Sequence, residues 1–331
     1  MRVRSKIWRA GLTWAGWTSF AGGGILSAEA VSISQEVALR PPTQEWVITT
    51  LENGNELSWD ALSQAAGDAA LKAEKRQRLD AMEGWLLVAK WARILGSDQR
   101  AVTTRWVNAI NAAQLGHENM TRSYRPPTSP LSAVVSPEFF GAVVGGLDLS
   151  RSFFETITPY DYLPRVLQVL DELYRAGEAL FETYQELALA VAVVRDVLPP
   201  PAGPHGQVSD EILPRKVPSA KQTYAFWVES DMRGKTLHCL SRLKASELKF
   251  VIDAAAPLSD LRWAQEQASY DLGSLPGAYD AVRYRDDRVE REIYSWPGRD
   301  YALSTILSEG GICIDQGYFA SEVCKAKGVP T

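Results

Sequence analysis

The chain has 331 residues, of which 46% are hydrophobic, and a formal net charge of −5 at pH 7. This hydrophobic content is enough to build buried cores, so it excludes a globally disordered chain. The acidic balance argues against a nucleic-acid-binding protein, because such proteins carry a basic surface. The length predicts two domains, or one large domain with extensions.

Residues 1–30 have the features of a secretory signal peptide. A basic start is followed by an uncharged apolar run from Ala10 to Leu26, and Ala28 and Ala30 fit the small-x-small cleavage rule. We therefore expect cleavage after Ala30 and export of the mature chain to a periplasmic or extracellular space. An uncleaved anchor is the alternative, because the apolar run is long. No later stretch is long enough to span a bilayer, so no membrane span is expected in the mature chain.

Residues 31–198 are predicted to be a helical region. Apolar side chains recur at helical spacing on a first helix that Gly96 ends, and they are Met82, Trp85, Leu86 and Ala89. Ser97-Asp98 caps a second helix, whose predicted buried face consists of Val102, Trp106, Ile110 and Ala113. Two such helices in tandem predict a hairpin. This region is interpreted as a packed scaffold, since no repeat period is sustained.

A second helical block follows several prolines. Pro164 suits the first turn of a helix whose apolar stripe runs from Val166 to Tyr174, and Leu187 to Val194 is predicted to be a buried helix segment. Residues 199–258 are then interpreted as a proline-rich linker followed by a mixed segment. Within it, Thr223 to Val228 is β-prone and predicts a strand, and Ala245 to Asp253 predicts a short helix.

Cysteine and histidine usage limits the chemistry. The chain has three cysteines and three histidines, and no cluster of them supplies the ligands of a zinc site, so no metal and no cofactor are predicted. In an exported protein an odd cysteine count leaves at least one free thiol. Cys313 and Cys324 are too far apart on one helix to pair. Cys239 could pair with either, but nothing in the sequence requires it.

Residues 259–331 carry the most informative stretch. Gly310-Gly311 precedes Cys313 at the expected first turn of a helix, which Gly328 and Pro330 end. Small residues line one face of this helix, namely Cys313, Gly317, Ala320 and Cys324, with Phe319 and Val323 beside them as apolar anchors.

This placement gives Cys313 two interpretations. A helix N-terminus favours a thiolate and offers N–H groups to an oxyanion, which indicates a nucleophile. The alternative is a small buried residue at a tight helix contact, as most free cysteines are.

The stretch resembles the nucleophile helix of the transglutaminase-like superfamily. The resemblance rests on Gly-Gly-x-Cys-x-Asp, the aromatic pair Tyr318-Phe319 and the exit Gly328-Val329-Pro330, and it covers about the last seventy residues. It implies a papain-like α+β fold in which Cys313 attacks an amide carbonyl of a protein or peptide substrate. On the approach it implies helices at 260–266, 279–292 and 302–307. Asp315 and Gln316 are expected to support the helix start.

One element of the family pattern is missing. The family's His and Asp follow the Gly-x-Pro exit on later strands, whereas all three histidines here precede Cys313. We therefore expect a fold that is mainly α, ending in the helical front half of a transglutaminase-like domain whose sheet is missing. Without that sheet, Phe319 and Val323 have nothing flat to cover, and the tail should be exposed, frayed or packed incorrectly against the helical region.

Three functions remain open at this stage. The first is an incomplete cysteine acyl-transfer or amide-hydrolysing enzyme that is inactive by itself. The second is a non-catalytic helical interaction or scaffold protein of the periplasm or cell surface. The third is a purely structural helical protein. Trp296 and Tyr301 are candidates to line the approach to Cys313, and the charges from Arg283 to Arg291 are interpreted as a solvated helix face. The sequence does not determine an oligomeric state.

Overall fold

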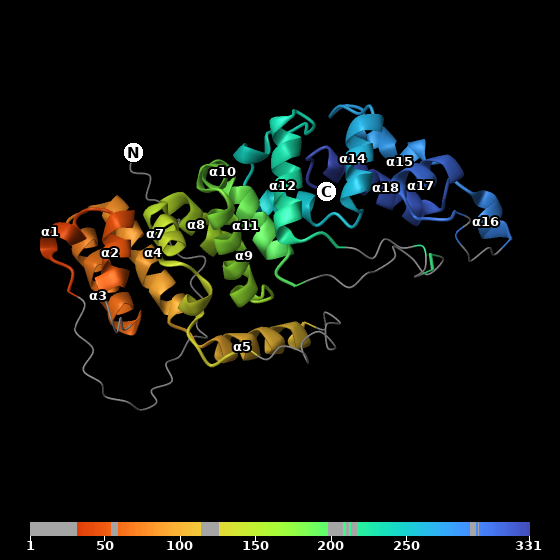
Figure 1. Cartoon of the computed structure of the whole chain (residues 1–331). Helices are drawn as coiled ribbons and strands as arrows, with labels where there is room; N and C mark the ends of the chain where they lie inside the picture. Colours follow the sequence, from red (N-terminus) through yellow and green to blue (C-terminus); the bar gives the residue numbers. More distant parts are fainter. Residues whose placement is uncertain are drawn as a thin grey trace, which may run out of the picture.

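The computed structural model describes residues 32–53, 59–113, 126–197, 208–209, 212, 217–291, 296 and 298–331. These residues form an elongated array of helices (Figure 1). Strand pairing in the described part is limited to isolated bridges, Asp98 with Pro130 and Tyr284 with Gly311. The described chain is therefore mainly helical, as predicted. The expected signal peptide and the prolines 199–201 lie outside the described residues.

The N-terminal part contains α1 (Gln35–Ala38), α2 (Gln44–Asn53), α3 (Trp59–Lys75), α4 (Leu79–Leu95) and α5 (Gln99–Ala112). Gly96 ends α4 and the Asp98 side chain accepts from the Ala101 N–H, so both predicted boundaries are confirmed. The predicted hairpin of α4 with α5 is wrong. Instead α4 packs along α3, and α5 packs against α9.

The buried face of α4 is rotated from the predicted stripe. Trp85 is buried as predicted, but Leu86 is exposed and Val88 and Trp91 are buried in its place. The helix is apolar on most sides, so spacing alone leaves its orientation open. Contacts with neighbouring helices determine the orientation of α4. Trp91 donates to the buried Ser150 hydroxyl at 3.0 Å, and Trp85 stacks edge-to-face on Trp46.

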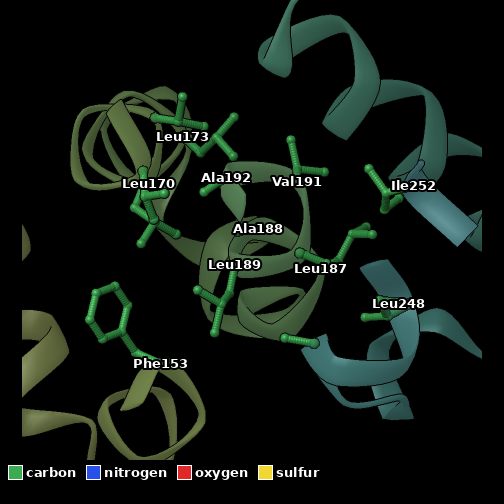
Figure 2. Packing of buried hydrophobic residues seen from close by; sticks show 14 of the residues in the cluster. Phe153, Leu170, Leu173, Leu187, Ala188, Leu189, Val191, Ala192, Leu248 and Ile252 are labelled. Atoms are coloured by element: carbon green, nitrogen blue, oxygen red, sulfur yellow. The ribbon is translucent and has the colours of Figure 1, made fainter. Parts of the chain in front are cut away.

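The middle part contains η1 (Leu131–Val134), α7 (Pro137–Gly145), α8 (Leu147–Thr156), α9 (Leu163–Ala176), α10 (Glu178–Thr183) and α11 (Gln185–Val194). Pro164 lies in the first turn of α9, and the stripe from Val166 to Tyr174 is buried, as predicted. Figure 2 shows α11 at the centre of this core, with Leu187 facing Leu248 and Ile252 of α13, and Leu189 near Phe153 of α8. The predicted burial of Leu187 to Val194 is confirmed for its first six residues.

A buried carboxylate ties α11 to its neighbours. Glu186 accepts from the Ser152 hydroxyl on α8, from Lys244 at 3.0 Å, and from the Ala245 N–H at 2.8 Å. Such charge-assisted bonds offset the cost of burying the carboxylate. They also fix the start of α13 against α11.

The next part contains α12 (Ala220–Met232), η2 (Leu240–Arg242) and α13 (Ala245–Ile252). The strand predicted at Thr223 to Val228 is wrong, because these residues lie inside α12. A reciprocal cap explains the helix. The Ser219 hydroxyl accepts from the Gln222 N–H, and the Gln222 side chain accepts from the Ser219 N–H. This cap and the burial of Phe226 and Trp227 outweigh the β-propensity of the segment.

The C-terminal part contains α14 (Leu258–Gln267), η3 (Leu275–Gly277), α15 (Ala278–Ala281), α16 (Asp286–Glu290), α17 (Leu303–Glu309) and α18 (Cys313–Ala326). The single helix expected over 279–292 is wrong. It is divided by extended residues around Tyr284, which bridge to Gly311. Helix α18 packs against α13, α14, α15 and α17. Over the described residues, none of the helices has the length and apolar character needed to cross a membrane.

Candidate functional site

Cys313 is the first residue of α18, as predicted, and its side chain is exposed. A cysteine at this position lies next to the free N–H groups and the positive end of the helix dipole. The interpretation of Cys313 as a small buried packing residue is therefore wrong. The thiol is presented to solvent at a helix N-terminus.

Two glycines before the thiol are required by the backbone geometry. Gly310 has φ of +72°, and a Cβ there would collide with the Arg283 carbonyl oxygen. A Cβ on Gly311 would collide with the Asp315 side chain. Gly311 donates to the Arg283 carbonyl at 3.0 Å and accepts from the Arg285 N–H at 2.9 Å. The glycines thus fasten the turn before Cys313 to the extended segment around Tyr284.

The Asp315 side chain also holds the turn before Cys313 in place. It is fully buried, accepts from the Ile312 N–H at 2.8 Å and from the Tyr301 hydroxyl at 2.7 Å, and lies 3.9 Å from the Arg288 guanidinium. One oxygen therefore caps the first turn of α18 while the other holds an aromatic hydroxyl. Burial and the hydrogen bond to Asp315 raise the pKa of Tyr301, so this hydroxyl remains a donor.

Gln316 adds a third attachment for the first turn. Its side-chain amide donates to the Val282 carbonyl at 2.8 Å, and the residue is buried. The expectation that Asp315 and Gln316 support the helix start is confirmed by these contacts.

Trp296 and Tyr301 do not have the geometry expected of residues that line an open approach to Cys313. Both are buried, and they pack edge-to-face with ring centroids 4.9 Å apart. Tyr301 also packs on Tyr318 of α18. Trp296 and Tyr301 therefore support the start of α18 and do not line an open approach to the thiol.

The solvated face expected from Arg283 to Arg291 holds only in part. Arg285 pairs with the half-exposed Asp287, but Arg288 is 2% exposed and lies over the Trp296 ring. The charge pattern does not predict this, because burial of Arg288 depends on tertiary contacts with Trp296 and with Asp315, 27 residues further along the chain. Arg288 is thus a buried cation at the candidate site that the sequence did not reveal.

The rest of α18 is anchored, so the expected fraying of the tail is wrong. Phe319 and Val323 are buried among the neighbouring helices. The buried Glu322 accepts from the Ala256 N–H at 2.8 Å, and Lys325 pairs with Asp253 at 2.9 Å. Gly328, with φ of +72°, ends the helix as predicted.

The face of small residues on α18 is less covered. Cys313 is exposed, and Gly317, Ala320 and Cys324 are each partly exposed. A Cβ on Gly317 would meet no atom within 4 Å. There is therefore room beside Gly317, whereas Ala320 and Cys324 are packed against the core, and the opposite face carries the apolar and polar anchors.

The histidine that the structure describes is at the wrong end of α18 to act on Cys313. Leu237, next to His238, donates to the Lys327 carbonyl just after the helix. A helix of 14 residues is about 21 Å long. His238 therefore lies far from the thiol, and His117 and His205 lie outside the described residues.

In the described part of the chain, the other thiols and the possible metal ligands do not form a second candidate site. Cys239, Cys313 and Cys324 are all free, so none of the disulfides left open by the sequence is formed. Among the described residues, no group of three or more His, Cys, Asp or Glu side chains could hold a metal ion.

The arrangement can supply a solvent-accessible thiol on a rigid helix start, with backbone N–H groups close by for an oxyanion. No protein-family model, curated protein or solved structure matches the chain.

Proposed function

We propose that residues 259–331 are the nucleophile-bearing helical half of a transglutaminase-like domain, with Cys313 as the nucleophile. The observation that carries this proposal is the exposed thiol at the first position of α18, held by Gly310, Gly311 and Asp315. A merely structural cysteine would not require a buried carboxylate and two constrained glycines around an exposed side chain.

The chemistry proposed for the complete domain is thiol-mediated acyl transfer or amide hydrolysis. The Cys313 sulfur forms a bond to the carbonyl carbon of an amide, the C–N bond breaks, and the leaving amine takes up a proton. The thioester then passes its acyl group to an amine or to water. The N–H groups of the first turn of α18 are placed to stabilise the oxyanion of each addition step.

The described part of the chain lacks one component of this chemistry. Proton transfer to the leaving amine needs an acid within hydrogen-bond reach, and His238 is at the opposite end of α18. We therefore propose that the chain by itself forms a thioester with an activated acyl donor but does not turn over amide substrates. The exported location also remains part of this proposal.

The test is acylation by p-nitrophenyl acetate, whose leaving group needs no acid. A Cys239→Ser/Cys324→Ser variant keeps Cys313 as its sole thiol, and mass spectrometry follows the acetyl group. We expect one hydroxylamine-sensitive acetyl group on Cys313, formed about fivefold faster than on the urea-unfolded protein, the size expected from a helix dipole. Equal rates in the folded and unfolded states would contradict the proposal.

A second candidate function is a non-catalytic helical scaffold, and the partly exposed small-residue face of α18 favours it. A partner helix or sheet can approach closely over Gly317 and Ala320. The same experiment separates the two functions. A scaffold predicts an acetylation rate for Cys313 no higher than that of the unfolded chain.

A further inference from the structure

A cavity of about 860 Å³ lies in the middle of the molecule, away from any residue discussed above as a catalytic candidate. Its wall is formed by the starts of α5, α9 and α12 and by the residues that follow α11. This volume is within the range of sites for small organic molecules, roughly 300–1,000 Å³. The residues that line the cavity determine which class of ligand it can bind.

Three helix N-termini meet at this cavity. Gln99 is the first residue of α5, Pro164 is in the first turn of α9, and Ser219 is the N-cap of α12. These helices have 14, 14 and 13 residues, so each carries a developed dipole. The start of α5 is already capped by the Asp98 carboxylate, whereas α12 is capped by the neutral Ser219 hydroxyl, so the positive end of α12 favours a negatively charged occupant.

A buried guanidinium adds a full positive charge to the same wall. Arg195 is 7% exposed, and its Nε has no hydrogen-bond partner among the described residues. One terminal nitrogen donates to the Ile252 carbonyl over 3.4 Å, a long bond. The guanidinium also lines the cavity, so an anionic group bound there can accept a charge-assisted hydrogen bond from it.

The neighbouring carboxyl does not take the place of that ligand. Asp196 accepts from the backbone N–H groups of Tyr162 and Val197. Burial, with a contribution from Asp161, raises its pKa to about 7, so the group is largely neutral in mildly acidic solution. Arg165 in the same wall is paired with Glu172 at 3.1 Å, so the positive charge that the wall offers to a ligand is that of Arg195.

Part of the cavity lining is apolar. It is formed by Pro126, Pro127, Val134, Val217 and Ala220. An inorganic anion would leave this surface in contact with water, whereas a ligand with an apolar body would cover it.

We propose that this cavity binds a small organic anion, whose charged group is held by Arg195 and the start of α12 and whose apolar body lies against the prolines. The anion site at Arg195 and the apolar wall are parts of one pocket. The proposal does not depend on the chemistry of Cys313.

The test uses two fluorescent probes that share their rings. 8-Anilinonaphthalene-1-sulfonate carries a sulfonate, and N-phenyl-1-naphthylamine lacks it. We expect one sulfonate probe per chain, and Arg195→Gln to weaken its binding about tenfold while the neutral probe changes less than about twofold. Arg233→Gln, an exposed arginine at the end of α12, is the matched control and should change neither. Unchanged sulfonate binding in Arg195→Gln, or equal weakening of both probes, would overturn the proposal.

A second variant keeps the test decisive if Arg195→Gln does not fold. Gln168 is exposed and lines the cavity from α9, so Gln168→Trp should block it without disturbing the core. We expect both probes to bind about tenfold more weakly to Gln168→Trp. Gln168→Ala should bind them as the wild type does. Wild-type binding by Gln168→Trp would place the probes elsewhere and overturn the proposal.

Discussion

Two buried arginines show how differently this chain uses a buried positive charge. Arg288 lies 3.9 Å from the Asp315 carboxylate and over the Trp296 ring. Arg195 lies beside Asp196, whose oxygens are occupied by backbone N–H groups. The first cation is compensated by the protein itself, within the cluster that holds the start of α18. The second faces a cavity.

The difference separates a supporting role from a binding role. A charge compensated inside the fold fixes geometry, and here it fixes the turn that presents Cys313. A charge left beside a cavity is available to a ligand.

The largest expected effect is the loss of the Asp315 carboxylate. Asp315→Ala removes the acceptor of two hydrogen bonds and the counter-charge of Arg288, so it should lower the free energy of unfolding by about 4 kcal/mol. Urea denaturation measures this. Asp287→Ala, which removes a half-exposed partner of Arg285, should cost less than about 1 kcal/mol. Equal costs would show that Asp315 is not a central support.

The next effect is the pH dependence that Asp196 contributes. Its pKa is about 7 in the folded protein, against an ordinary value of 3.8, so the folded state binds the proton more tightly. Its contribution to stability is therefore lost as the pH rises from about 4 to 7. Relative to the wild type, Asp196→Asn should gain stability over that window, by roughly 3 kcal/mol in total, and show no further gain above it.

Asp271 provides a control of opposite sign. Hydrogen bonds from Ser274 lower its pKa from the ordinary 3.8. Its contribution is present above that value and lost as the pH falls, so Asp271→Asn should lose stability relative to the wild type as the pH rises through the acidic range. A constant difference between Asp196→Asn and the wild type from pH 4 to 7 would refute the assignment for Asp196.

Two glycine substitutions in and before α18 should change the stability of the fold by smaller amounts and in opposite directions. Gly311→Ala forces the Asp315 side chain to move and should destabilise the fold by about 1–2 kcal/mol. Gly317→Ala meets open space inside the helix and should stabilise it by about 0.5–1 kcal/mol. Thermal unfolding of both variants checks the pair. Destabilisation by Gly317→Ala would show that the small-residue face is already covered.

Local signals in the sequence were sufficient for several features of the site. Gly310-Gly311 and Gly328 bracket α18, and both ends were predicted because helix boundaries depend on nearby residues. The same holds for Gly96 and Asp98 around α4 and α5. Asp315 was predicted to support the helix start, although its partners were not.

Features that depend on remote contacts were missed. The burial of Arg288 and Tyr301 follows from their packing beneath α18, which no local pattern encodes. The cavity is formed by helix starts separated by many residues, so it has no sequence signature. The wrong strand at Thr223 to Val228 is different, because Ser219 and Gln222 form a capping box that the sequence already contained.

We propose that the setting of Cys313, and not exposure alone, makes it a nucleophile. Cys239 is the internal control, since it is also exposed but lies beside the Asp231 carboxylate, 4.0 Å from its Oδ2. The decisive measurement is the alkylation rate of each thiol at pH 6 with anionic iodoacetate and neutral iodoacetamide. We predict that the iodoacetate-to-iodoacetamide rate ratio is about fivefold higher at Cys313, because it lies at the positive end of α18. A ratio at Cys313 equal to or below that at Cys239 would contradict the account.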